Sequence, residues 1–124
     1  MLLLDTHVLL WWLDDPSSIA GRARELIADP SRAVFVSAAA AWEITIKRQL
    51  GKLDAPDDLE DALERERFQH LPIAVRHALA VAELPPIHAD PFDRIQIAQA
   101  RLEGLTIVTR DGRIPRYEVP CLRA

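Results

Sequence analysis

The sequence predicts an α/β/α sandwich, in which helices cover both faces of a mostly parallel central sheet of four to five strands. Short apolar runs typical of buried strands alternate along the chain with longer segments of helical character. Such alternation produces parallel sheets joined by right-handed crossovers. In addition, a chain of 124 residues that is 49% hydrophobic can bury one core. We therefore expect a single domain over residues 1–124.

The expected strands are short and apolar. Met1–Leu4 is an apolar run that ends at an acid, which is typical of a central parallel strand buried on both faces. The segment 105–109 is rich in β-branched residues. The remaining candidates are 33–36, 70–73 and, as a last edge strand, 119–122.

The expected helices are recognised mainly by their ends. A helix over 6–13 has Asp5 or Thr6 as its N-cap, and Ser17 or Ser18 can cap a second helix that reaches about Ala28. Further helices are expected over the charged segment 57–67 and from the end of the 70–73 strand to about Leu84.

Two helices have start and stop signals at both ends. Ser37 can cap a helix that continues through Leu50 and stops at Gly51, because glycine takes the left-handed conformation without steric cost. The last helix, 90–103, begins with the Asp90–Pro91 pair and ends at Gly104.

Several acids are expected to gather at one edge of this sheet. Asp5 and Asp111 directly follow strands, and ligands of open parallel sheets bind beyond the carboxyl ends of the strands. The 90–103 helix runs antiparallel to the strand that follows it, so its amino end returns to the same edge with Asp90 and Asp93.

Glu43 is a further candidate, on the helix that follows Ser37. It lies six residues beyond that serine, which is roughly 9 Å along a helix. Glu43 therefore reaches the other acids only if its helix leans across the edge of the sheet.

A cluster of carboxylates needs a compensating interaction. Like charges about 4 Å apart repel by roughly 4 kcal/mol at an effective dielectric near 20. Either the pKa values of some acids rise, or a divalent cation is bound. Cys121 is the only cysteine, and hard oxygen ligands suit Mg²⁺ or Mn²⁺ better than zinc. Such a metal supports phosphoryl transfer or phosphodiester hydrolysis.

Each acid also has a structural interpretation. Asp90 fits an N-cap, and Asp93 is favoured in the first turn by the helix dipole. Glu43 can pair with Lys47 one turn later, whereas Asp111 suits a turn. Asp5 is the hardest to explain in this way.

The remaining polar and aromatic residues are ambiguous. Thr6 and Thr109 can hydrogen-bond a metal-bound water, or serve as a cap and a strand residue. The four histidines are scattered without metal-ligand spacing and are interpreted as structural or surface residues: His7, His70, His77 and His88. Of Trp11, Trp12 and Trp42, at least one is expected in the core and another to anchor a partner.

Charge and composition exclude some classes of protein. The formal charge is −4 at pH 7, so no strongly basic field attracts nucleic acid. Without the four candidate acids Asp5, Glu43, Asp93 and Asp111 the formal charge is zero. Candidates for phosphate contacts are Arg94, Arg110, Arg113, Arg116 and the basic patch Lys47, Arg48 and Lys52. The apolar start is too short to span a bilayer, and a cytoplasmic protein without membrane contact is expected.

Four segments in order, "LLLDTHVLLWW", "VSAAAAWEITIKRQLGKL", "HADPFDRIQIAQA" and "TIVTRD", resemble the PIN domain, and more narrowly the VapC-type toxin ribonucleases of bacterial toxin–antitoxin modules. The resemblance implies that Asp5, Glu43, Asp93 and Asp111 bind Mg²⁺ or Mn²⁺ and that the protein is an endoribonuclease. The implied substrate is single-stranded or looped RNA, such as tRNA or rRNA. The implied partners are a VapB-like antitoxin, whose tail covers the site, and a second copy in a homodimer.

One departure from these relatives concerns Ala38–Ala41, where relatives often have a second small hydroxyl residue. Two other functions stay open on the sequence. A phosphotransfer or receiver-like domain would use an aspartyl phosphate at Asp5, but it lacks a well-placed lysine after a late strand. A non-catalytic binding module would use the acids only to attract a basic partner.

Overall fold

The computed structural model describes all 124 residues, and its five strands form one sheet. The strand order is β3-β2-β1-β4-β5, and every neighbouring pair is parallel. The strands are β1 Leu2–Leu4, β2 Val34–Ser37, β3 Gln69–Leu71, β4 Thr106–Thr109 and β5 Cys121–Arg123. The predicted α/β architecture is confirmed, with a sheet that is parallel throughout.

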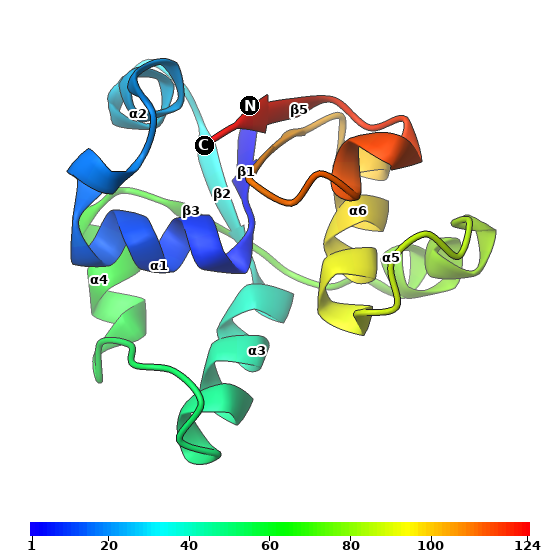
Figure 1. The fold of residues 1–124 in the computed structure, drawn as a ribbon, viewed down its shortest axis with the longest axis horizontal. Coiled ribbons are helices and arrows are strands. Elements are labelled where there is room, and N and C mark those ends of the chain that lie inside the picture. Colours follow the sequence, from blue (N-terminus) through cyan, green and yellow to red (C-terminus); the bar gives the residue numbers. More distant parts are fainter.

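Helices cover both faces of the sheet (Figure 1). They are α1 Thr6–Asp14, α2 Gly21–Ala28, α3 Ala38–Gln49, α4 Leu59–Arg65, α5 Val75–Ala80 and α6 Pro91–Glu103. Along β1, Leu2 and Leu4 point into the core shared with α1 to α4, whereas Leu3 points into a second core with α6. Alternating side chains of one buried strand thus contribute to both cores.

Three predicted caps are present. The side chain of Asp5 accepts from the Val8 N–H at the start of α1, and Ser37 accepts from the Ala39 N–H at the start of α3. Asp90 begins α6 by accepting from the N–H groups of the first turn. These caps satisfy N–H groups that have no partner within the helix.

The start of α2 differs from the prediction. Neither Ser17 nor Ser18 caps it, because Asp15 binds the N–H and hydroxyl of Ser17 and forms a separate 3₁₀ turn, Pro16–Ser18. The helix begins only at Gly21, without a side-chain cap.

Other boundaries move by a few residues. The charged helix α4 covers Leu59–Arg65 and not 57–67, because Arg67 takes a left-handed conformation with φ of 61°. The segment before Leu84 divides into α5 and a 3₁₀ turn, Val81–Glu83. A third 3₁₀ turn, Ile114–Tyr117, was not predicted.

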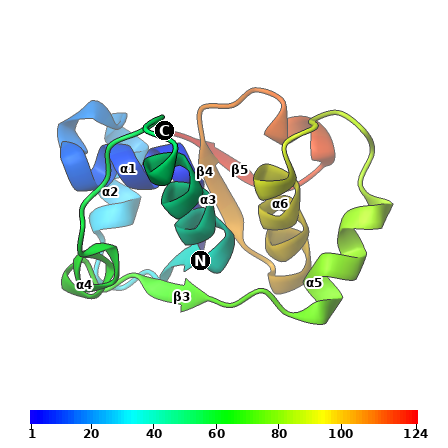
Figure 2. The ribbon, with the colours of Figure 1, turned by 90° about the horizontal axis from the view of Figure 1, so that it is seen from below.

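The carboxyl edge of the sheet is framed by three helices. The helices α1 and α3 begin there, directly after β1 and β2, and the amino end of α6 returns to the same side (Figure 2). The α3 and α6 helices pack side by side at this edge. No helix has the length and apolar character needed to cross a membrane.

Candidate metal centre

Asp5 occupies the end of the central strand. Its carboxylate is only 7% exposed, caps α1 at 2.8 Å from the Val8 nitrogen, and is hydrogen-bonded by the Thr109 hydroxyl from the neighbouring strand β4. Burial raises the pKa of Asp5, although the bonds from Thr109 and Val8 oppose the rise. Asp111, just beyond β4, is close enough for its charge to raise this pKa further.

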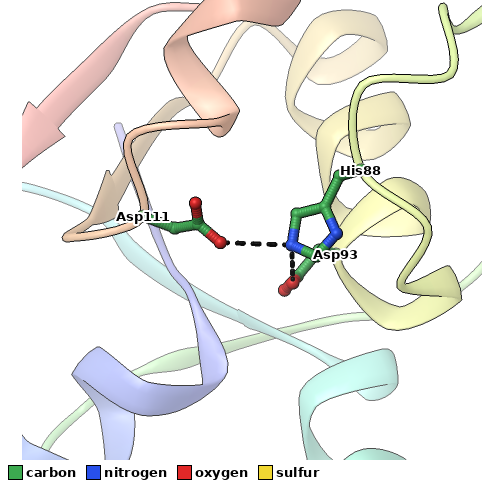
Figure 3. A group of neighbouring side chains, drawn as sticks. All are labelled: His88, Asp93 and Asp111. Carbon is green, nitrogen blue, oxygen red and sulfur yellow. Dashed lines mark hydrogen bonds and ion pairs between the residues drawn. The ribbon is translucent and has the colours of Figure 1, made fainter.

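A histidine joins Asp93 to Asp111 (Figure 3). The Nε2 atom of His88 lies 2.9 Å from a carboxylate oxygen of Asp93 and 3.1 Å from one of Asp111. One potential ligand atom from each of these three residues lies within 4.8 Å of the others. The three residues come from the loop before α6, the first turn of α6 and the turn after β4.

The hydrogen bonds of His88 determine where its proton lies. Its Nδ1 accepts from the Asp90 N–H at 3.1 Å, so this nitrogen carries no hydrogen. In the neutral ring the proton is therefore on Nε2, and the tautomer assigned from this network donates towards both carboxylates. The Nε2–H group thus reduces the repulsion between Asp93 and Asp111.

The two bridged acids differ in pKa. Burial, followed by the nearby charge of Asp90, raises the pKa of Asp93 to about 6, and the charges of Glu43 and Asp5 add to the rise. The Arg113 guanidinium beside Asp111 instead lowers the pKa of that acid to about 2. At neutral pH both are mainly ionised, which gives the site excess negative charge.

Glu43 reaches the same region from α3. Its side chain is 2% exposed and accepts a hydrogen bond from the Thr6 hydroxyl at 2.6 Å. It also forms the ion pair with Lys47 that the helical spacing allows. The charge of Glu43 is close enough to raise the pKa of Asp93, so α3 leans across the edge towards this acid. The structural pairing with Lys47 and the position near Asp93 therefore occur together.

Gln96 was not predicted as a site residue. It is buried on α6, and its Nε2 donates to the Phe92 carbonyl at 3.2 Å and towards the Thr6 hydroxyl at 3.4 Å. Its Oε1 has no hydrogen-bond partner although it is buried. Buried polar atoms are rarely left unpaired, so this oxygen is an open acceptor for a water. The usable signal in the sequence is a glutamine between two isoleucines of the helix.

His88 was interpreted from the sequence as structural or surface, and the structure places it inside the candidate site. No regular spacing relates it to the acids, because they come from different elements. Its position before the Asp90–Pro91 helix start was the only available signal. His77, by contrast, has the structural role expected for it, and pairs with Glu103.

Most of the candidate phosphate-binding cations are engaged within the chain. Arg113 pairs with Asp111, and Arg110 lies over the Trp11 ring at 4.2 Å and binds the Ala124 carbonyl. Arg94 binds the Tyr117 hydroxyl and four backbone carbonyls, those of Val81, Leu84, Pro85 and His88. These arginines stabilise the fold around the site.

The donor set fits a hard divalent cation. The structure brings Asp93 and Asp111 together through His88, and places Asp5 beside them through Thr109. Asp90 differs, since its carboxylate is used by the first-turn N–H groups of α6. Carboxylate oxygens dominate the set. A bound cation would stabilise the ionised forms of Asp5 and Asp93, whose pKa values are raised, and one of its waters could donate to the unpaired Gln96 oxygen.

Comparison with known proteins identifies the family. The family model of the PIN domain matches residues 2–120. The chain belongs to the PIN-domain family. It is 30% identical over 121 residues to Ribonuclease VapC22 of Mycobacterium tuberculosis, covering 95% of this chain and 92% of that protein. The chain is thus a homologue of the VapC-type PIN ribonucleases.

Solved structures show the same PIN fold. VapBC2 from Rickettsia felis, crystallised with a DNA fragment from its promoter, matches with a TM-score of 0.73 at 14% identity over 98% of this chain and 97% of that one. DNA-bound VapBC from Salmonella typhimurium matches with a TM-score of 0.70 at 17% identity, over 98% and 96% of the two chains.

Proposed function

We propose that this PIN-domain protein is a metal-dependent endoribonuclease of the VapC type, the toxin of a toxin–antitoxin module. One observation carries the proposal: side chains from separate elements gather at the carboxyl edge of the parallel sheet into a cluster with excess negative charge. Its centre is His88, Asp93 and Asp111, whose ligand atoms lie within 4.8 Å of one another, and the charges of Asp5 and Glu43 are close enough to raise the pKa of Asp93. The homology to Ribonuclease VapC22 supports RNA as the substrate.

The proposed ligands of the cation are Asp5, Glu43, Asp93 and Asp111, with His88 beside them. A bound Mg²⁺ or Mn²⁺ would supply charge stabilisation at the phosphate and a more acidic water. Thr6 orients Glu43, while Lys47 balances the charge of that acid. The unpaired Gln96 oxygen can accept a hydrogen bond from a water.

The proposed reaction is hydrolysis of a phosphodiester bond. The water oxygen bonds to phosphorus, the bond from phosphorus to the leaving nucleoside oxygen breaks, and that oxygen takes up a proton. The residues of this chain hold and orient the groups around the reacting phosphate. Because Asp93 has a pKa of about 6, it is mainly ionised at neutral pH, as a ligand or proton acceptor must be.

The proposed partners follow from the solved relatives. The proteins from Rickettsia felis and Salmonella typhimurium were crystallised as VapBC complexes. We propose that a VapB-like antitoxin covers the acidic cluster of this chain and that the chain forms a homodimer. A cluster with excess negative charge favours a basic segment of such an antitoxin.

The test is cleavage of single-stranded and structured RNA by protein freed of antitoxin, with Mg²⁺, with Mn²⁺ or with a chelator. We expect cleavage only with a divalent ion. The Asp5→Asn variant should lose more than about 100-fold in rate, because metal-site residues contribute at least that much. Asparagine is also a good N-cap, so α1 should remain folded.

A matched control is Asp14→Asn, at the exposed opposite end of α1, which should cleave like the wild type. Cleavage that continues unchanged in the chelator would contradict the proposal. So would an Asp5→Asn variant that retains full activity.

A further inference from the structure

An aromatic pair lies next to the acidic cluster. Trp42 on α3 and Phe92 at the start of α6 contact each other edge to face, with ring centroids 5.3 Å apart and an angle of 81° between the planes. Trp42 is 60% exposed and is the only aromatic residue among the large exposed hydrophobic side chains. Leaving an indole in solvent forgoes the hydrophobic stabilisation of burying it, so its exposure needs an explanation.

The sequence places each aromatic residue directly before a candidate site acid. Trp42 precedes Glu43, and Phe92 precedes Asp93. Consecutive side chains on a helix point about 100° apart. Trp42 and Phe92 therefore contact each other between α3 and α6, just outside Glu43 and Asp93. Glu43 is buried and Trp42 is exposed, which places the indole at the solvent-exposed rim of the acidic cluster.

The rim has little free positive charge. Lys47 is paired with Glu43, and Arg113 is paired with Asp111. Arg94 is used by backbone carbonyls. An RNA strand that approaches the cluster of carboxylates therefore gains little from cations at these positions. An uncharged contact that does not depend on phosphate neutralisation is needed to hold the strand.

We propose that the Trp42–Phe92 pair is a stacking platform for an unpaired nucleobase next to the phosphate that is cut. This inference rests on the proposed ribonuclease function and identifies a substrate subsite of it. Stacking on an aromatic ring accepts any base with a free face, which a base within a duplex does not offer. The platform thus selects RNA that is single-stranded, or extruded in a loop, at the cleavage position.

The test measures binding without cleavage. Fluorescently labelled single-stranded RNA is titrated in Mg²⁺ with the inactive Asp5→Asn protein, with and without Trp42→Ala, by anisotropy. Removing a base-stacking ring should weaken binding roughly 5- to 100-fold, and Trp42→Phe should restore most of it. The matched control is Leu50→Ala, an exposed apolar residue at the other end of the same helix, which should bind normally.

A second measurement locates the contact on the RNA. Oligonucleotides with a single abasic ribose at successive positions should bind the Trp42 protein more weakly only when the missing base lies next to the cut phosphate. The same oligonucleotides should bind Trp42→Ala with equal affinity. Duplex RNA should be unaffected by Trp42→Ala.

The outcomes separate the two proposals. If the wild-type protein cleaves RNA but Trp42→Ala binds and cleaves equally well, the platform is wrong and the ribonuclease function stands. If Trp42→Ala changes only sedimentation or antitoxin binding, the aromatic pair is a protein contact and the platform is also wrong. If no RNA is bound or cleaved with any divalent ion, the proposed function itself fails.

Discussion

Among single residues of the site, Asp93 has a pKa well above its ordinary value. Its side chain is 19% exposed, and burial together with the charge of Asp90 raises its pKa from 3.8 to about 6. Between those two pH values the folded protein binds a proton that the unfolded chain has released. The free energy of unfolding therefore falls as the pH rises from about 4 to 6, and it stays reduced above pH 6.

Replacing Asp93 with asparagine should remove this cost. In a chelator at pH 7.5, we expect Asp93→Asn to increase the free energy of unfolding by up to about 3 kcal/mol and to raise Tm. At pH 4 the difference should vanish, because Asp93 of the wild type is then protonated in the folded state. Thermal melts at both pH values check this, with Asp14→Asn as the control. An equal difference at both pH values would show that the charge of Asp93 is not the cause.

His88 shows how a single ring can organise several elements. Its Nδ1 accepts from the Asp90 N–H, and its Nε2 faces Asp93 and Asp111. The bond to Nδ1 fixes the tautomer, so the proton is on Nε2, which faces the two carboxylates. The ring thereby links the start of α6 to the turn after β4.

At the scale of elements, the segment before α6 is attached to the rest of the fold by Arg94. The guanidinium of this residue binds the carbonyls of Val81, Leu84, Pro85 and His88. The carbonyls of Val81 and Pro85 also accept backbone N–H groups within the segment, and Arg94 adds donors to all four carbonyls at once with its planar guanidinium. The position of His88 therefore depends on Arg94.

Arg94→Lys should lower the free energy of unfolding by about 2 kcal/mol, because a lysine ammonium cannot reach the same set of carbonyls. Urea unfolding measures this change. Arg101→Lys, at an exposed position on the same helix, is the control and should be nearly neutral. If both variants unfold at the same urea concentration, the carbonyl network contributes little and the anchoring of the segment must be revised.

For the molecule as a whole, the acidic side chains that serve the function lower the stability of the fold when no cation is bound. The chain gathers acids at one edge of the sheet, and a bound divalent cation would offset their repulsion. A ligand that binds only the folded state at 100 times its Kd adds about 2.7 kcal/mol. For a chain of this size this corresponds to a Tm increase of roughly 10 °C.

We therefore expect saturating Mg²⁺ or Mn²⁺ to raise the Tm of the wild-type protein by about that amount, as measured by thermal melts against a chelator. The Asp93→Asn and Asp111→Asn variants should respond much less, whereas Asp14→Asn should respond fully. If the ion raises the Tm of all these proteins by the same amount, it binds elsewhere on the surface.

Structural features that depend only on neighbouring residues can be predicted from the sequence, whereas features that depend on the path of the chain cannot. The strand after Met1, the caps at Asp5, Ser37 and Asp90, and the glycine that ends α6 depend on neighbouring residues, so their patterns were sufficient. The serine caps proposed for α2 were wrong because Asp15 competes for the same N–H and hydroxyl groups. Such competition depends on the actual path of the turn.

The sequence by itself determined the alternation of strands and helices, and with it the edge at which Asp5, Asp93 and Asp111 are found. Only the tertiary structure decided that α3 leans across that edge to bring in Glu43, that His88 bridges two acids, and that Gln96 keeps an unpaired oxygen. The physical reason is that the pattern of apolar residues and the helix caps depend on neighbours in the chain. Contacts between side chains of different elements instead depend on how those elements pack.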